Sequence, residues 1–74
     1  MKFENVLLKT RIIEKYGSQE NFAKVLGVSP VTVNKKVNGR SQMTLDDVDE
    51  WARRLQIGVD DIGKFFLQRL LSEN

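Results

Sequence analysis

The chain has 74 residues, a length that supports one small hydrophobic core. It contains no cysteine and no histidine, which excludes disulfide bonds, thiol chemistry and a histidine general base. Its net charge is only +2, but residues 1–44 hold eight basic and three acidic side chains, whereas residues 45–74 hold four basic and seven acidic ones. A basic half of this kind is typical of a surface that binds a polyanion.

No apolar run approaches the roughly 20 residues that span a bilayer, and the first residues lack the apolar stretch of a signal peptide. We therefore expect no membrane partner and a cytoplasmic, reducing location. Helical spacing of apolar residues recurs along the chain and strand-like alternation does not. The sequence therefore predicts a single all-α domain of five helices over residues 1–74.

The first helix is predicted over residues 4–16, and Gly17 ends it. Apolar and small residues at helical spacing give it an inward-facing stripe of Val6, Leu7, Thr10, Ile13 and Tyr16. Ser18 is a good N-cap for the second helix, which runs to about residue 26. The apolar side of this helix consists of Phe22, Ala23, Val25 and Leu26.

Gly27 can turn the chain, and a third helix then opens at Ser29 and Pro30, because serine caps a helix and proline fits its first turn. This helix ends at Asn38 and Gly39. Residues 18–39 therefore form a predicted helix-turn-helix, a shape that can place its second helix in the major groove of DNA.

The third helix has two different sides when its residues are placed at 100° intervals. Val33 and Val37 lie together and are expected to pack inward, whereas the opposite side carries Val31, Asn34, Lys35 and Asn38. An amide can pair with adenine, lysine can reach guanine or a phosphate, and a valine can touch a thymine methyl group. The alternative is that these polar residues only keep a surface helix soluble.

Thr44 is expected to cap the fourth helix, and Asp47 can complete a capping box with it. The inner face of this helix is predicted to consist of Leu45, Val48, Trp51, Ala52 and Leu55. Gly58 then breaks the chain before a fifth helix over residues 60–71.

Apolar residues cover roughly 240° of the fifth helix, more than one core contact requires. Ile62, Phe65 and Phe66, and in one arrangement Leu70, would pack inward. Leu67 and Leu71 would then point away, which makes the fifth helix a candidate dimerisation element. The alternative is a frayed C-terminal segment over a small core.

Five runs of sequence, residues 18–23, 26–29, 38–39, 45–48 and 52–57, together with Val33, resemble the lambdoid phage Cro and repressor family. This family is also called the xenobiotic-response-element class of helix-turn-helix proteins, and the resemblance covers about residues 10–62. It implies a compact, λ-repressor-like fold and a sequence-specific regulator of transcription that occupies double-stranded operator DNA as a homodimer. It also implies a phage or prophage origin, a nucleoid-associated location in a bacterial host cell, no cofactor and no small-molecule effector.

The resemblance also implies roles for individual residues. The base-reading positions are Ser29, Pro30, Val31, Asn34 and Lys35. The positions that contact the DNA backbone are Gln19, Lys36, Asn38, Arg40 and Arg11. The sequence departs from the family at Pro30 and Val31, where many relatives carry glutamine or arginine, and at Lys36, where a large apolar residue is common. These departures favour readout by shape or by methyl contact at the first two positions.

The sequence predicts no enzyme and no metal site. Its acidic residues gather in the first turns of helices, where they favour the positive end of the helix dipole. Its glycines are scattered and form no phosphate-binding loop. The main alternative function is a protein-interaction module on the same fold, for example an antitoxin that blocks a partner.

Overall fold

The computed structural model describes the backbone of residues 6–71 and the side chains of residues 6–66. Within this range the chain forms five α-helices and one short 3₁₀ turn, and it forms no β-strand. The predicted all-α fold is therefore confirmed. In chain order the elements are α1 (Val6–Tyr16), α2 (Gln19–Leu26), α3 (Pro30–Val37), α4 (Leu45–Arg54), the 3₁₀ turn η1 (Val59–Asp61) and α5 (Ile62–Leu71).

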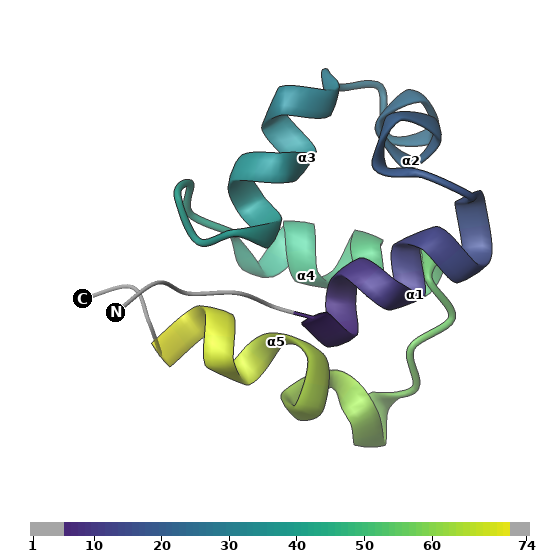
Figure 1. Ribbon diagram of the computed structural model, residues 1–74. Helices are drawn as coiled ribbons and strands as arrows, with labels where there is room; N and C mark the ends of the chain where they lie inside the picture. The colour runs from purple at the N-terminus through teal and green to yellow at the C-terminus, as the bar shows by residue number, and fades with distance from the viewer. Residues whose placement is uncertain (1–5, 72–74) are drawn as a thin grey trace.

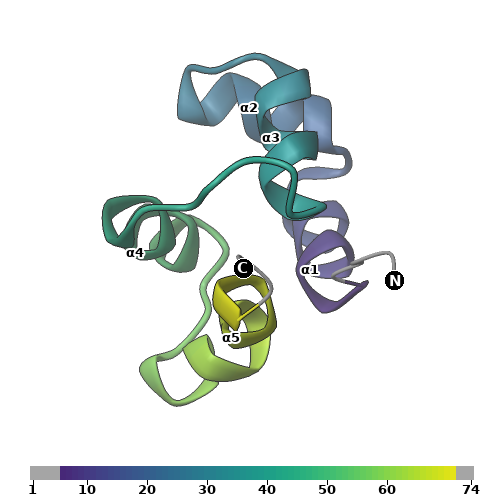
Figure 2. The ribbon, with the colours of Figure 1, turned by 90° about the vertical axis from the view of Figure 1, so that its left-hand side faces the viewer.

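The helices surround one core. Helices α2 and α3 pack against each other at one end of the molecule, and α1 packs on α2 and on α5 (Figure 1). In the view turned by 90°, α4 and α1 lie on opposite sides, and α5 lies below them (Figure 2). This arrangement leaves the outer side of α3 at the surface, away from α5.

All three predicted N-caps are confirmed. The hydroxyl groups of Ser18, Ser29 and Thr44 each accept the backbone N–H of the residue three positions on, at 3.0–3.2 Å. In α4 the Asp47 carboxylate accepts the Thr44 N–H in return, at 3.0 Å, which completes the predicted capping box. These bonds satisfy amide groups that have no partner inside the helix, so each helix start is fixed locally.

The buried side of α1 differs from the predicted stripe. Leu8 and Ile12 have no exposed surface, whereas Val6, Leu7 and Ile13 are 48–63% exposed. The predicted inward positions were therefore wrong for these three residues and for Thr10, which is also exposed. Adjacent apolar pairs made the error possible, because either member of each pair can continue a helical spacing.

Polar contacts at the end of α1 determine which side faces inward. The Tyr16 hydroxyl donates to the carbonyl of Arg54 at 2.9 Å. The Arg11 guanidinium donates to the carbonyls of Leu55 at 3.0 Å and Gln56 at 3.2 Å. The last carbonyls of a helix have no partner within it, so α1 closes the C-terminal end of α4. This contact fixes the rotation of α1 about its own axis.

Helix α4 ends earlier than Gly58, the residue predicted to break the chain. Gln56 adopts a left-handed conformation with a φ of 56°, and the Ile57 N–H donates to the Ala52 carbonyl at 2.8 Å. This is the pattern of a Schellman motif, formed here without glycine. Leu45 was also predicted to face inward but is 82% exposed, because it is the first helical residue and lies beyond the edge of the core.

Near the start of α4 it is Met43, and not Leu45, whose side chain is buried in the core. It precedes the Thr44 cap, and both Met43 and Val48 are buried in the core. An apolar residue before the cap and another at the fourth helical position form a hydrophobic staple, which sets the direction in which the chain enters a helix. The centre of the core is aromatic, with the Phe22 ring 5.0 Å from Trp51 and 5.1 Å from Tyr16 between ring centroids.

The predicted fifth helix, residues 60–71, is divided into η1 and α5. Phe65 and Phe66 are buried and Ile62 packs against the core, as predicted. The side chains of Leu67, Leu70 and Leu71 lie outside the described residues, so the dimerisation element stays a prediction. None of the helices within residues 6–71 is long and apolar enough to cross a membrane.

The isoleucine pair on α1 provides a direct test of the observed packing. We expect Ile12→Ala to lower the free energy of unfolding by about 2–5 kcal/mol, because it leaves a cavity in the core. Ile13→Ala should change it by less than about 1 kcal/mol, because Ile13 is 54% exposed. Urea denaturation of both variants measures the difference, and Ile12→Val, which costs about 0.5–1.5 kcal/mol, serves if Ile12→Ala does not fold. Equal losses at the two positions would contradict the packing.

Candidate nucleic-acid interface

Helix α3 presents the outward side that the sequence predicts. Val33 and Val37 have no exposed surface, whereas Val31 is 61% exposed and Asn34 and Lys35 are exposed. Pro30 and its cap Ser29 are exposed at the start of the same helix. We call the five outward residues the α3 face: Ser29, Pro30, Val31, Asn34 and Lys35. They are the predicted base-reading residues, and the fold places them together.

The start of the α3 face has little hydrogen-bonding capacity left to offer. The Ser29 hydroxyl accepts the Thr32 N–H at 3.2 Å and lies 3.1 Å from the Thr32 hydroxyl. Pro30 has no N–H and occupies the first helical position. The surface at this end is therefore formed by the Pro30 ring and the Val31 side chain, which suit apolar contact.

The middle of the α3 face is connected to α2. Gln19 begins α2, and its Oε1 accepts a hydrogen bond from Asn34 Nδ2 at 3.3 Å. The two residues are 15 positions apart, so this contact depends on the packing of α2 against α3. The bond orients the Asn34 amide on an otherwise exposed side of the helix.

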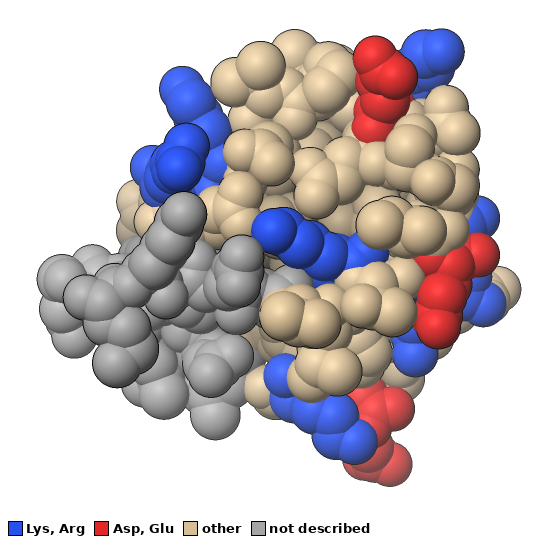
Figure 3. Space-filling view, viewed as in Figure 1, with Lys and Arg blue, Asp and Glu red and all other residues tan. Residues whose placement is uncertain are grey.

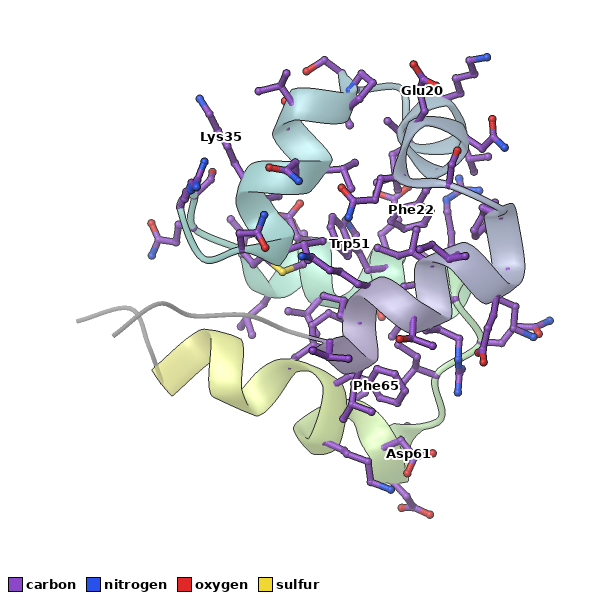
Figure 4. The ribbon with its side chains drawn as sticks, viewed as in Figure 1. Glu20, Phe22, Lys35, Trp51, Asp61 and Phe65 are labelled. Atoms are coloured by element: carbon purple, nitrogen blue, oxygen red, sulfur yellow. The ribbon has the colours of Figure 1, made fainter. Side chains whose placement is uncertain are left out.

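The end of the α3 face is basic. Asn38 caps α3, Gly39 has a φ of 77°, and the Arg40 N–H donates to the Lys35 carbonyl at 2.8 Å. This Schellman motif returns the chain toward the last turn of α3. Lys35 points away from the core into solvent (Figure 4). Among the described residues, the Lys35 and Arg40 side chains have no hydrogen-bond or ion-pair partner.

Charge is distributed unevenly along this side. Basic side chains gather at the edge of the molecule beside the C-terminal end of α3, and uncharged surface covers its N-terminal end (Figure 3). Three exposed valines lie on α2, in the turn and on α3, namely Val25, Val28 and Val31, which are 40–61% exposed. The outer side of the helix pair therefore combines a basic end with an apolar end.

Lys36, a predicted DNA-backbone contact, does not join the α3 face. Its Nζ lies 2.9 Å from Asp47 Oδ2, and both side chains are mostly buried, at 20% and 24% exposed. The ammonium group connects α3 to the first turn of α4. Sequence reasoning recognised Asp47 as part of a capping box but missed this ion pair, and the only signal was a lysine at a position where an apolar residue is expected.

Arg11, the other predicted backbone contact outside α2 and α3, also has partners within the fold. Besides its bonds to the end of α4, its guanidinium lies 4.9 Å from the centre of the Phe65 ring. A cation over an aromatic face is attracted by the ring's electron density. Arg11 thus connects α1, α4 and α5, a structural role that the sequence did not reveal. Within residues 6–66, no three acidic, histidine or cysteine side chains gather where they could hold a metal ion.

Two comparisons with known proteins found matches. Residues 1–69 match the family described as protein of unknown function (DUF739), and the chain belongs to this family. The fold is similar to the solution structure of the modulator of repression (MOR) of the temperate bacteriophage TP901-1 from Lactococcus lactis. The TM-score is 0.80, with 32% sequence identity over 93% of each chain. No curated protein matches this sequence.

The ion pair between Lys36 and Asp47 predicts how stability depends on pH. Burial acts to raise the pKa of Asp47, but hydrogen bonds from the Thr44 backbone and Lys36 outweigh it and hold the pKa below its ordinary 3.8. A lowered pKa in the folded state stabilises the fold above the unfolded value and loses this effect as the pH falls. The contribution of ionised Asp47 should therefore be complete above about pH 5 and be lost progressively as the pH falls from 3.8 through the lower pKa of the folded state.

This prediction is tested with Asp47→Asn, which removes the charge and keeps the shape. Above about pH 5 we expect this variant to lose about 1–3 kcal/mol of unfolding free energy, and the difference from the wild type should shrink in acid. Asp46→Asn, at an exposed position in the same turn, is the matched control and should lose less. Urea titrations at several pH values measure both, and a pH-independent difference for Asp47→Asn would contradict the proposed cause.

Proposed function

We propose that this member of the DUF739 family is a phage regulatory protein that binds operator DNA through the α3 face. The observation that carries the proposal is an exposed helix whose outward amide is braced by Gln19 and whose end holds two cations, Lys35 and Arg40, without partners among the described residues. An α-helix with its side chains is about 10–12 Å across, which matches the width of the DNA major groove of about 12 Å.

The similar solved structure supports a regulatory role. That protein is described as the modulator of repression of a temperate bacteriophage. Its sequence is 32% identical to that of this chain over the matched region. A protein that changes repression acts either on an operator or on the protein that occupies it. Residues 1–44 carry an excess of basic side chains and contain α2 and α3, which favours action on the operator. Membership in the lambdoid Cro and repressor class, inferred from sequence resemblance, is part of this proposal.

The proposed contacts divide into two groups. Lys35 and Arg40 contact phosphates beside the groove, where they supply affinity without sequence preference. Asn38 and the amide N–H groups of Gln19, which have no partner among the described residues, donate to the same backbone. Lys36 and Arg11 are left out of this interface, because both have partners within the fold. The proposal assigns no catalytic step and no cofactor.

A second candidate function is contact with a protein, such as a repressor whose operator occupancy changes as a result. The exposed valines Val25, Val28 and Val31 favour it, because they follow one another at three-residue intervals through α2, the turn and α3, and exposed apolar side chains are used in protein interfaces. The small number of cations on the α3 face also favours it. A protein partner would cover the apolar end of this surface, whereas DNA requires its basic end.

Removal of the two cations tests the operator proposal. We expect Lys35→Ala with Arg40→Ala to abolish specific duplex binding, and to reduce the slope of log affinity against log salt by about 2 for any residual binding. The matched control is Arg53→Ala with Arg54→Ala, which removes the same charge from α4 and should leave binding nearly unchanged. Fluorescence anisotropy with a selected duplex at several salt concentrations measures both variants. Equal effects would assign the loss to net charge alone.

The duplex for this test comes from selection on a random library at about physiological salt, where non-specific phosphate binding is weak. An enriched sequence supports DNA recognition. The absence of any enrichment would reject the operator proposal and favour the protein partner, for which substitution of Val28 and Val31 by serine should then abolish regulation.

The proposed dimer makes a separate prediction. Two copies related by a two-fold axis would select a palindrome with half-sites about one helical turn apart. We expect Leu67→Glu with Leu71→Glu to halve the sedimentation mass and weaken operator binding without unfolding the domain. If the mass of the double variant is unchanged, α5 is not the dimerisation element.

A further inference from the structure

We propose that the outward side of α1 is a contact surface for a second copy of this chain, whose α1 packs parallel to the first about a two-fold axis. Three residues at the spacing of a coiled-coil seam form the contact, namely Val6, Thr10 and Ile13, and we call them the α1 seam. This inference does not depend on operator binding. It also concerns a surface separate from the α3 face and from the predicted dimerisation element in α5.

The α1 seam is exposed although two of its three residues are strongly apolar. Val6 is 63% exposed and Ile13 is 54% exposed, and Thr10 is exposed between them. The core uses the other side of the helix, where Leu8 and Ile12 are buried. Helix α1 lies at the edge of the molecule, on the side opposite α4 (Figure 2). It therefore carries apolar residues on two sides, and the core covers only one of them.

The spacing of the α1 seam suits a partner helix. Steps of four and then three residues place its members within about 60° on one side of α1. The same steps separate the d, a and d positions of a heptad, at which two helices pack with their axes nearly parallel. A helix that lies along α1 would therefore contact all three residues.

The charges beside the seam favour a second α1 as that helix. Lys9 lies about 40° beyond one edge of the seam, and Glu14 lies about 40° beyond the other. They occupy a g and an e position, five residues apart, which meet across a parallel two-stranded interface. Lys9 has no hydrogen-bond or ion-pair partner within residues 6–66, and Glu14 is 63% exposed in its pair with Arg11. Two parallel copies would form two equal ion pairs between Lys9 and Glu14, one on each side of the seam.

The antiparallel arrangement of two α1 helices fits less well. Its layers pair a positions with d positions, so Thr10 would face Ile13 of the other copy. Glu14 would then lie beside Leu7 instead of Lys9. In the parallel arrangement each seam residue faces its own counterpart, which brings isoleucine to isoleucine and one threonine hydroxyl to the other.

The size of the seam predicts a weak contact. Stable protein–protein interfaces bury about 1,200–2,000 Å² in total. Helix α1 has only 11 residues, and three side chains from each copy cover a small part of that area. We therefore expect a dimer that forms at high protein concentration and dissociates on dilution.

Cysteine cross-linking tests the contact, because the chain has no cysteine of its own. Two copies of Thr10→Cys meet across the parallel seam. Oxidised glutathione should therefore convert this variant to a covalent dimer at least about tenfold faster than Asp46→Cys, an exposed control on α4. In an equimolar mixture of Thr10→Cys and Ile13→Cys, mass spectrometry should find mainly the two homodimers. Equal rates for the Thr10 and Asp46 variants would overturn the inference, and so would a predominance of the mixed dimer.

Exchange of the flanking charges tests the choice of partner. We expect Lys9→Glu and Glu14→Lys each to raise the dissociation constant of the dimer by about tenfold, because each brings like charges together twice. The double variant restores opposite charges and should return the constant to within about twofold of the wild type. Glu20→Lys, exposed on α2, changes the net charge as Glu14→Lys does and is the matched control. Sedimentation equilibrium at low salt measures these constants, and a double variant as weak as the single ones would contradict the pairing.

The outcomes separate this contact from the other proposals. A dimer that responds to Leu67→Glu with Leu71→Glu but to none of the α1 variants would overturn the α1 contact and support α5. Failure to enrich a duplex would reject operator binding and leave the α1 contact standing, because the α1 seam and the α3 face are different surfaces.

Discussion

The Asp47 carboxylate is the polar group that joins α3 to the start of α4. One oxygen, Oδ2, accepts the Thr44 N–H at the start of α4 and also binds the Lys36 ammonium group from α3. The same atom therefore starts one helix and fixes the neighbouring one. Two partly buried charges are costly to bring out of water unless they are paired and hydrogen-bonded, and this pair meets both conditions. The ion pair adds to the buried Val33 and Val37 in holding the inner side of α3, so that its opposite side faces outward.

A second set of contacts holds the opposite end of α4. Arg11 and Tyr16 from α1 bind its final carbonyls, and Arg11 also packs on Phe65 of α5. Helix α4 is therefore connected to α3 at its start and to α1 at its end. The aromatic core, with Phe22 and Trp51 in contact, fills the space between these two connections. The candidate interface residues on α3 are therefore supported by a helix, α4, that is bonded to its neighbours at both ends.

Features of the sequence that act locally were predicted correctly. Serine or threonine caps, a proline at the first turn and a glycine after the last turn determine helix ends through neighbouring residues alone, and Ser29, Thr44 and Gly39 behave as expected. The inward side of α1 was not predicted, because Leu8 and Leu7 are equally apolar and the choice is made by partners more than 35 positions away.

The same reason explains the candidate site. The outward residues of α3 follow from helical spacing, so they could be read from the sequence. Lys36 and Arg11 were assigned to the DNA backbone from the family resemblance, whereas their partners within the fold, Asp47 and the end of α4, are brought close only by folding. The sequence shows the charge of a side chain but not the partner that folding brings to it.

The capped ends of α3 affect how fast this helix can be recognised by a partner. The Ser29 cap and the Schellman motif at Gly39 order the backbone of this helix before any partner arrives. Little backbone entropy is then lost on binding, and the ordering cost falls mainly on the long side chains of Lys35 and Arg40. An encounter governed by these two charges would proceed at similar rates with many polyanions. We expect correct and incorrect targets to differ chiefly in how long each complex persists.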